Sequence, residues 1–257
     1  MGPAVTRAAV LVAALRTAAA CTTVAGYVLL CGPPILLWTL LSRRPRLLYA
    51  AGGAGVRVGF ALAGIHLAVR GLQHIQAGGA VYACNHSSNI EPPAVFLALR
   101  RLFPRLRVLY KAELRRLPVL VWVFDVAGFV PVERANREQS WPAIARAAQA
   151  LRAGHSFFIF PEGTRSRTGE ILPFKKGGFV MALQAQAPVV PVAVSGGRLA
   201  MRKGSPLIWP TTVTVELLPP VPTAGLTFED RQTLVAHVRG AIAATLARTD
   251  STTPEPG

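Results

Sequence analysis

The spacing of hydrophobic and polar residues changes twice along the chain and divides it into three parts. From Thr17 to Ser42, 26 consecutive residues carry no formal charge. Residues 57 to 77 repeat apolar side chains at spacings of three and four, as one face of an α-helix does. Beyond Gly79, short apolar or β-branched runs alternate with helical stretches. The pattern therefore predicts an apolar anchor, an amphipathic helix and an α/β domain.

The uncharged segment is long enough to cross the ~30 Å hydrocarbon core of a bilayer. Pro33 and Pro34 interrupt it, so a kinked span and a re-entrant helical hairpin both fit. The arginine cluster at positions 43 to 46 is typical of the cytoplasmic side. A cleaved signal peptide is a third alternative, although the run is long and lacks a clear small-residue cleavage site. We assign residues 1–45 to a membrane anchor.

The second part, residues 46–78, is expected to be an amphipathic connecting helix. Its apolar positions are Val58, Leu62, Ile65, Val69 and Leu72, and its polar stripe is His66, Arg70 and His74. Such a helix could lie in the headgroup layer or cover the sheet, and the spacing does not separate the two. The two histidines of the stripe fit an interface or solvent better than a metal site.

The third part contains six runs that predict strands. They are VYACN from 81, VLYKA from 108, FVPVE from 129, FFIF from 157, VVPVAV from 189 and VTVELL from 213. Strands that alternate with helices form a largely parallel mixed sheet flanked by helices. We predict one α/β domain over residues 79–247 and a disordered tail over 248–257.

Local signals place two of the helices of this domain. Asn136 with Gln139 resembles a capping box, and Gly154 is expected to end the helix that follows. Thr227 with Asp230 is expected to open the last helix.

Composition narrows the class of partner. At 257 residues the chain can bury one sizeable core, and with 51% hydrophobic and 16% charged residues it is apolar enough to suggest contact with lipid. The 28 basic against 12 acidic residues favour anionic partners. The basic residues are scattered and match no nucleic-acid motif, which favours anionic lipid or a phosphorylated substrate. The three cysteines give neither a disulfide framework nor a metal spacing, and we interpret them as buried thiols in a reducing compartment.

The loops after the strands carry the candidate chemistry, as expected for an α/β sheet. NHSSNIEPP follows the first strand, and its two prolines suit the first turn of a helix. His86 and Glu91 then bracket a helix N-terminus, where a carboxylate can hold an imidazole that acts as a general base. Taken alone, a histidine near an acid is also common on protein surfaces.

A second unusual loop, FPEGTRSRTGEILPFKKGGF, follows the strand at 157. Glycine lets the backbone approach a ligand, and arginine offers a planar fork for phosphate oxygens. Gly163 and Arg165 therefore indicate a phosphate-binding loop.

Four blocks in this order resemble the 1-acyl-glycerol-3-phosphate acyltransferase family, or lysophosphatidic acid acyltransferases, within the glycerolipid acyltransferases. They are NHSSNIEPP, YKAELRRLPVLVWVFDVAGFVPVER, FPEGTRSRTGEILPFKKGGF and VVPVAVSG, which together cover about residues 81–197. The third block is highly specific. Position 91 is Glu where most of the family carries Asp, which keeps the carboxylate and adds one methylene.

The resemblance implies a glycerol-3-phosphate acyltransferase-like fold and a reaction without a covalent acyl-enzyme. His86 would take the proton from a free glycerol hydroxyl as that oxygen attacks a fatty-acyl thioester, and Glu91 would hold the histidine tautomer. Backbone N–H groups near Ser87 and Ser88 would stabilise the oxyanion. No metal or bound cofactor is expected, and acyl-CoA or acyl-carrier protein serves as co-substrate.

By the same resemblance, Lys111 and Arg165 bind the phosphate of the acceptor. The residues expected to shape the glycerol site are Asn85, Ser88, Glu162, Gly163 and Thr164. Lys175 and Lys176 are expected to touch the acyl donor or lipid headgroups.

The expected protein is an enzyme of phospholipid biosynthesis that converts lysophosphatidic acid to phosphatidic acid. Its partners would be a lysophospholipid, an acyl thioester and the bilayer, with acyl-carrier protein as one alternative donor and no nucleic acid. We expect it at the cytoplasmic face of a bacterial inner membrane. The alternatives are another lysolipid or glycerol-3-phosphate as acceptor, and a lipid-binding scaffold without turnover.

Overall fold

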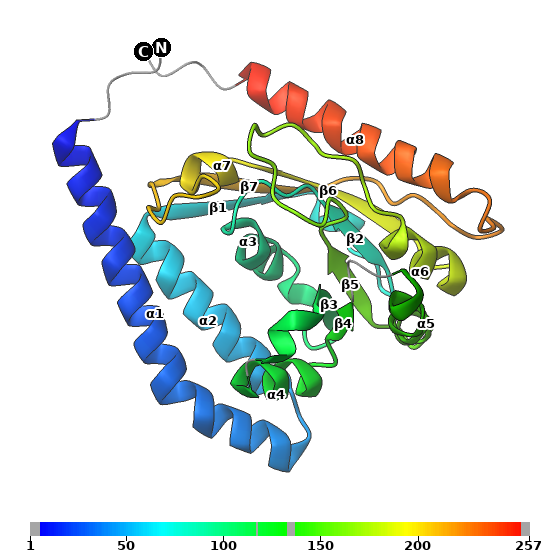
Figure 1. Ribbon diagram of the computed structural model, residues 1–257, viewed down its shortest axis with the longest axis horizontal. Helices are drawn as coiled ribbons and strands as arrows, with labels where there is room; N and C mark the ends of the chain where they lie inside the picture. Colours follow the sequence, from blue (N-terminus) through cyan, green and yellow to red (C-terminus); the bar gives the residue numbers. More distant parts are fainter. Residues whose placement is uncertain (1–5, 117, 133–136, 253–257) are drawn as a thin grey trace.

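A sheet of seven strands with helices on both faces forms the centre of the computed structural model, which describes residues 6–116, 118–132 and 137–252 (Figure 1). The strand order is β1-β7-β6-β2-β5-β3-β4. Neighbouring strands are parallel except β6 and β7, which run antiparallel. The predicted α/β fold with a largely parallel mixed sheet is therefore confirmed.

Six of the strands coincide with the runs predicted from the sequence, and β1 does not. The bounds are β1 Ile65–Arg70, β2 Val81–Cys84, β3 Leu106–Lys111, β4 Val130–Val132, β5 Ser156–Ile159, β6 Val189–Ser195 and β7 Thr211–Leu217. All four residues of β2 are fully buried, because this strand lies between β5 and β6 in the middle of the sheet.

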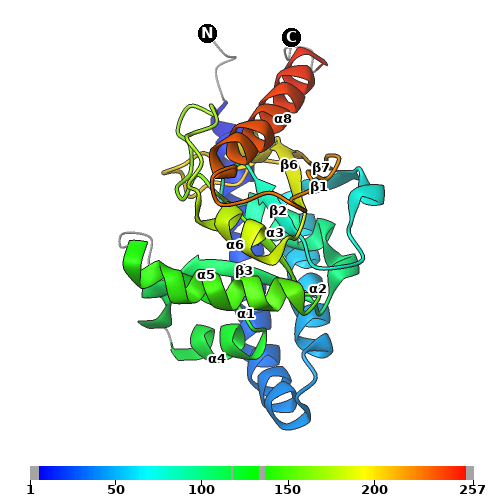
Figure 2. The same cartoon turned by 90° about the vertical axis from the view of Figure 1, so that its right-hand side faces the viewer.

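The helices divide between the two faces of the sheet (Figures 1 and 2). Their bounds are α1 Arg7–Ser42, α2 Arg46–Ala63, α3 Glu91–Ala98, α4 Pro118–Val126, α5 Arg137–Arg152, α6 Gly177–Ala185, α7 Gly197–Ala200 and α8 Arg231–Thr252. Short 3₁₀ turns cover Leu72–His74 (η1), Arg100–Leu102 (η2) and Ala112–Arg116 (η3). Because side chains alternate along a strand, Tyr82 packs in the core under α2 and α3, whereas Val81 packs under α5, α6 and α8.

The amphipathic helix expected over residues 57–77 is wrong beyond Ala63. Gly64 ends α2 in the left-handed region, with φ 75° and its N–H donating to the Ala61 carbonyl at 3.2 Å. Residues 65–70 then form β1, which pairs in parallel with β7.

The error has a simple physical cause. Ile65 and Val69 are four positions apart, a spacing that serves one face of a helix and one face of a strand equally well. Leu67 lies between them and packs against the same core, which is the alternation of a strand. His66 is exposed on β1, and His74 lies in η1.

Two other element boundaries also differ from expectation. The tail expected from 248 is helical as far as Thr252, and residues 253–257 lie outside the described residues. Asp230 Oδ2 accepts from the N–H and the hydroxyl of Thr227 at 2.7 and 3.0 Å, but the pair forms a turn before α8 rather than its first turn. Asn136 also lies outside the described residues.

The anchor segment forms one continuous helix, α1, that includes both Pro33 and Pro34. The turn of a re-entrant hairpin is therefore not at the prolines. The chain reverses at Arg43 instead, which has φ 53°, and α2 returns alongside α1 (Figure 1). The Tyr27 hydroxyl donates to the Ala51 carbonyl at 3.0 Å and joins the two helices.

One side of α1 packs against the rest of the protein and the other is exposed. On the packed side, the Ile208 N–H donates to Thr17 Oγ1 at 2.9 Å. The exposed apolar residues of α1 are Val10, Leu11, Val12, Leu15, Val28, Leu29, Leu30, Leu37, Trp38, Leu40 and Leu41. Among the described residues, α1 is the one helix long and apolar enough to cross a membrane.

Tyr49 fastens α2 to the sheet. Its side chain is buried, its hydroxyl donates to the Leu106 carbonyl at the start of β3, and the Ala127 carbonyl lies 3.4 Å away. Its ring packs against Phe96 and Phe103, which also contact each other. The α1–α2 hairpin is thus attached to the strand that leads to Lys111.

Candidate active site

The carboxyl ends of three neighbouring parallel strands meet at one edge of the sheet. The NHSSNIEPP loop follows β2, the FPEGTRS loop follows β5, and β3 ends at Lys111. The side chain of Lys111 lies outside the described part of the structure. Loops at this edge are where open α/β sheets bind their ligands.

His86 and Glu91 form a hydrogen-bonded pair in the loop after β2. The distance from His86 Nδ1 to Glu91 Oε2 is 2.9 Å, and the side chains are 16% and 0% exposed. A carboxylate at Nδ1 favours the tautomer with the proton on that nitrogen, which leaves Nε2 as an acceptor. The imidazole also stacks on Phe160, with ring centroids 4.2 Å apart. The arrangement is that of a general base held by a carboxylate.

The Glu91 carboxylate is held by more than the histidine. Ser87 donates to it twice, from its N–H at 2.7 Å and from its hydroxyl at 2.5 Å. Glu91 also begins α3, where the helix dipole stabilises a negative charge. Because the Ser87 N–H is engaged by Glu91, the part of the oxyanion expectation that concerns Ser87 is wrong, and the part that concerns Ser88 stays a prediction.

Gly197, at the start of α7, makes room for a glutamate at position 91. A Cβ atom on residue 197 would lie 2.7 Å from Glu91 Oε1 and 2.9 Å from its Cγ. The sequence analysis missed this contact, because no local pattern joins the glycine after β6 to the loop after β2. The close approach explains how the structure accommodates the extra methylene of Glu91.

Asn85 and Ser88 use their side chains to hold the loop. The Asn85 amide donates to the Val194 carbonyl at 2.9 Å and accepts from the Val194 N–H at 2.7 Å. The Ser88 hydroxyl donates to the Met201 carbonyl at 2.8 Å and accepts from the Ile90 N–H at 3.2 Å. Both side chains are buried, so they fix the backbone around His86.

Glu162 joins the two loops. One carboxylate oxygen accepts from the His86 N–H at 2.7 Å, and the other accepts from the Leu172 N–H at 3.0 Å. Burial raises the pKa of this carboxyl, and the two backbone bonds oppose the rise. The Ser166 N–H donates to the His86 carbonyl at 2.8 Å, so the FPEGTRS loop is fastened to both sides of the histidine.

Lys203 lies against the same loop and was not predicted. Its ammonium donates to the Arg165 carbonyl at 2.7 Å and lies 3.4 Å from Thr164 Oγ1. Arg165 itself is half-buried. Lys203 follows α7 in a segment without a recognisable motif, and its role depends on the folded contact.

The two lysines after the FPEGTRS loop differ in position. The side chain of Lys175 lies against Gly163, whereas the Lys176 ammonium lies 3.5 Å from the Gln232 amide oxygen of α8. The structure therefore brings Lys175, and not Lys176, to the predicted site loop. Among the described residues, no group of three or more His, Cys, Asp or Glu side chains could hold a metal ion.

The part of the chain that contains this site matches a known protein family. The family model named Acyltransferase matches residues 66–195, just over half of the chain. The chain belongs to the Acyltransferase family. The resemblance inferred from the sequence blocks is thereby confirmed.

Relatives in this family are identical to the chain at about a third of the matched positions. A 1-acyl-sn-glycerol-3-phosphate acyltransferase of Cocos nucifera is 35% identical over 56% of this chain and 46% of its own length. The human 1-acyl-sn-glycerol-3-phosphate acyltransferase beta is 31% identical over 76% of this chain and 69% of its own. The chain spans about half the length of the first of these relatives.

A solved structure shares the Acyltransferase fold over nearly the whole chain. The crystal structure of the 1-acyl-sn-glycerophosphate (LPA) acyltransferase PlsC from Thermotoga maritima gives a TM-score of 0.73, with 24% identity over 93% of this chain and 96% of that one. At this identity the likeness establishes the fold alone.

The predicted site residues all lie within the Acyltransferase match. Gly197 and Lys203 lie beyond its end at residue 195. The two residues that the sequence analysis missed are therefore also outside the region that defines the family, and only their contacts with Glu91 and Arg165 connect them to it.

Proposed function

We propose that the protein transfers a fatty-acyl group from acyl-CoA or acyl-carrier protein to the free hydroxyl of lysophosphatidic acid, giving phosphatidic acid. The observation that carries the proposal is the His86–Glu91 pair, whose Nε2 remains as an acceptor beside a loop rich in basic residues. The relatives named above act on this class of acceptor by their names, which supports the same choice here.

In the proposed mechanism, His86 Nε2 accepts the proton of the acceptor hydroxyl as its oxygen attacks the thioester carbonyl. The tetrahedral intermediate collapses, the C–S bond breaks, and the imidazolium returns its proton to the leaving thiolate. Glu91 keeps the ring in the required tautomer and stabilises the imidazolium between the two steps.

Recognition of the phosphate is assigned to Arg165, supported by Lys111 and Lys175. Lys203 positions Arg165 by holding its carbonyl. A guanidinium binds two oxygens of a phosphate monoester at once, so a phosphate that carries close to two charges is preferred over one capped by choline or ethanolamine.

We further propose that the exposed apolar side of α1 rests in a lipid surface and brings the site to its lipid acceptor. Its most exposed leucine, Leu30, is 78% exposed. The arginines at 43 to 46 can bind anionic headgroups. The cytoplasmic face of a bacterial inner membrane is the location we propose, because a cluster of arginines next to an apolar segment is typical of that side.

The test is acceptor-dependent release of thiol from acyl-CoA by the full chain in detergent. We expect lysophosphatidic acid to be the best acceptor, and glycerol-3-phosphate to be poorer because it forgoes burial of an acyl chain worth ~0.8 kcal/mol per CH₂. Arg165→Lys should raise KM for lysophosphatidic acid. No thiol release with any acceptor would favour a scaffold, and a capped lysolipid as best acceptor would overturn the substrate assignment.

A further inference from the structure

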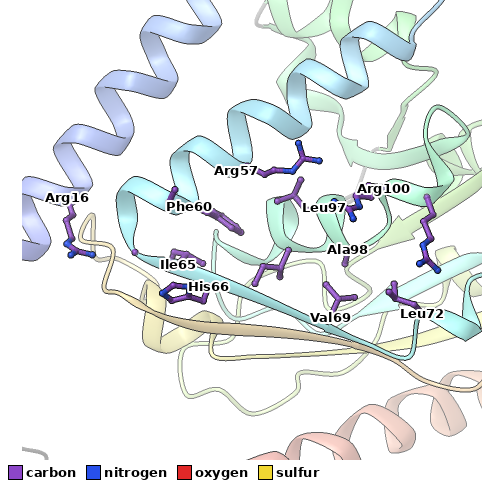
Figure 3. Close-up of a pocket in the computed structure, with 14 residues that line it drawn as sticks. Arg16, Arg57, Phe60, Ile65, His66, Val69, Leu72, Leu97, Ala98 and Arg100 are labelled. Carbon is purple, nitrogen blue, oxygen red and sulfur yellow. The ribbon is translucent and has the colours of Figure 1, made fainter.

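A cavity lies away from the His86–Glu91 pair, between α2, β1 and the end of α3 (Figure 3). Its volume is about 660 Å³, which is in the range of small-molecule pockets. The apolar lining consists of Phe60, Ala61, Ile65, Leu67, Val69, Leu72, Leu97 and Ala98. The basic lining consists of Arg16, Arg57, Arg100 and Arg101, together with His66.

The arginines are concentrated here beyond what the basic chain would give by chance. They make up four of the fourteen lining residues, against 24 Arg in 257 residues of the chain. Among the described residues, no Asp or Glu is part of this lining, and all four arginines are exposed at its rim. The cavity therefore combines an apolar floor with a rim that attracts an anion.

The cavity is separate from the candidate active site. Glu91 begins α3 next to His86, whereas Leu97 and Ala98 line the cavity from the other end of that helix. Leu97 is six positions along the helix from Glu91, about 9 Å along the axis at 1.5 Å per residue. The cavity is bounded on the other side by β1, the edge strand of the sheet.

We propose that this cavity binds one molecule of an anionic phospholipid from the bilayer. The phosphate lies on the guanidinium groups of Arg57 and Arg100, and the first part of an acyl chain lies on the floor beside Leu97 and Val69. Arginine suits the phosphate because its fork binds two oxygens together. A free phosphate would satisfy the rim but leave the apolar floor unused, and this favours the lipid.

The position of Arg16 supports a ligand drawn from the membrane. This residue belongs to α1, whose outer side carries the exposed leucines, and in Figure 3 its side chain extends toward the end of the cavity near Ile65 and His66. A lipid held here would contact the helix that we propose to lie on the bilayer. Its effect would be to fix the edge of the sheet near β1 against the headgroup layer.

The experiment measures bound lipid rather than turnover, so it does not depend on the proposed acyl transfer. The full chain in dodecyl maltoside is passed through a gel-filtration column equilibrated with radiolabelled phosphatidylglycerol in the same detergent at 0.5 M salt. High salt shortens the range of diffuse electrostatic attraction to a few Å and leaves close contacts. We expect saturable binding of about one phosphatidylglycerol per chain and no saturable binding of phosphatidylcholine.

Two variants test the two halves of the cavity. Arg57→Gln/Arg100→Gln removes the rim charges, and Val69→Phe fills the floor without any change of charge. Each is expected to weaken binding at least tenfold. The charge-matched control Arg146→Gln/Arg248→Gln, on the exposed sides of α5 and α8, should bind like the parent.

Four results would overturn the proposal. Equal losses in the control pair and the rim pair would mean diffuse charge attraction. Parent-like binding by Val69→Phe would mean that no chain lies on the floor. Loss of binding in Arg165→Gln would place the lipid in the candidate active site. Displacement of the lipid by millimolar inorganic phosphate would assign the rim to a free phosphate compound.

Discussion

The loops around His86 and the α1–α2 hairpin are built in opposite ways. In the loops, buried polar side chains bind backbone groups far away in the sequence, as Asn85 does with Val194 and Ser88 with Met201. In the hairpin, two long apolar helices pack together, the hydrogen bond from Tyr27 to Ala51 joins them, and one side remains exposed.

This difference teaches where each region can tolerate change. A general base needs its reacting nitrogen held in one place, and the network around Glu91 does this. A surface that meets fluid lipid needs apolar area rather than fixed geometry. Substitutions in the loops should therefore change rate and not membrane binding, and substitutions on the outside of α1 should do the reverse.

The largest expected effect is that of His86→Ala. Removal of the general base should lower kcat by at least ~10²-fold, since such assistance is worth about 10² to 10⁴. Thiol release would be measured at saturating acceptor, and membrane binding should stay at the parent level. Near-normal turnover by a folded variant would remove His86 from the mechanism.

Glu91→Gln should have the next largest effect. It keeps the size of the side chain but loses the charge that stabilises the imidazolium, and we expect kcat to fall at least about tenfold. Because Glu91 acts through His86, its loss should not exceed that of His86→Ala. Glu91→Asp keeps the carboxylate and should retain measurable activity. A Gln variant as active as the parent would show that the charge does not orient the base.

On the hairpin, Leu29→Asp/Leu30→Asp should release protein from liposomes. The two side chains are 74% and 78% exposed, and the charges would have to leave water to enter lipid. We expect a roughly tenfold lower bound fraction in flotation with unchanged kcat in detergent. Trp141→Asp/Phe228→Asp, at two exposed apolar residues away from α1, is the charge-matched control. Equal release of both variants would deny α1 a specific role.

A smaller effect is expected for Gly197→Ala. The new methyl group would clash with Glu91 Oε1 at 2.7 Å, so the carboxylate must shift away from His86. We expect kcat to fall several-fold with little change in KM, because the base is misplaced and the acceptor site is not. Gly78→Ala is the control, since a Cβ there meets nothing within 4 Å. Equal activity of the two variants would mean that Glu91 can move to make room for the methyl group without any loss of catalysis.

The smallest effect concerns pH. Burial raises the pKa of Glu162 in the folded protein above its usual value near 4.5. The stability that this group contributes is then fully present below its unfolded pKa and is lost as the pH rises through the folded pKa. In thermal unfolding in detergent, the parent should therefore lose more stability than Glu162→Gln as the pH rises above 4.5. Parallel pH profiles would contradict this.

The sequence predicted those elements whose signal is local. β2 could be predicted because a central parallel strand is apolar on both faces, and the four residues of VYAC are all fully buried. β1 could not, because the spacing of Ile65 and Val69 fits a helix as well as a strand, and only pairing with β7 decides between them. The turn at Arg43 was missed because the two prolines gave the stronger signal.

The same distinction applies to the site. His86 and Glu91 are five positions apart, so a short sequence motif is enough to predict their pairing. Ser88 and Met201 are 113 positions apart. Gly197 and Lys203 are also far in sequence from the residues that they contact, so no local pattern could predict these contacts. Such contacts are set by tertiary packing, which spacing along the chain does not encode.

Tyr49 links these two regions, and its position has a geometric consequence. Its hydroxyl binds the Leu106 carbonyl, so the helix that returns from the hairpin turn is joined to the strand that ends at Lys111. If α1 rests on lipid as proposed, the hairpin would carry the sheet with it. Binding to the membrane would then fix the distance of His86 from the acyl chains. Each new acceptor would reach His86 by lateral diffusion in the plane of the membrane.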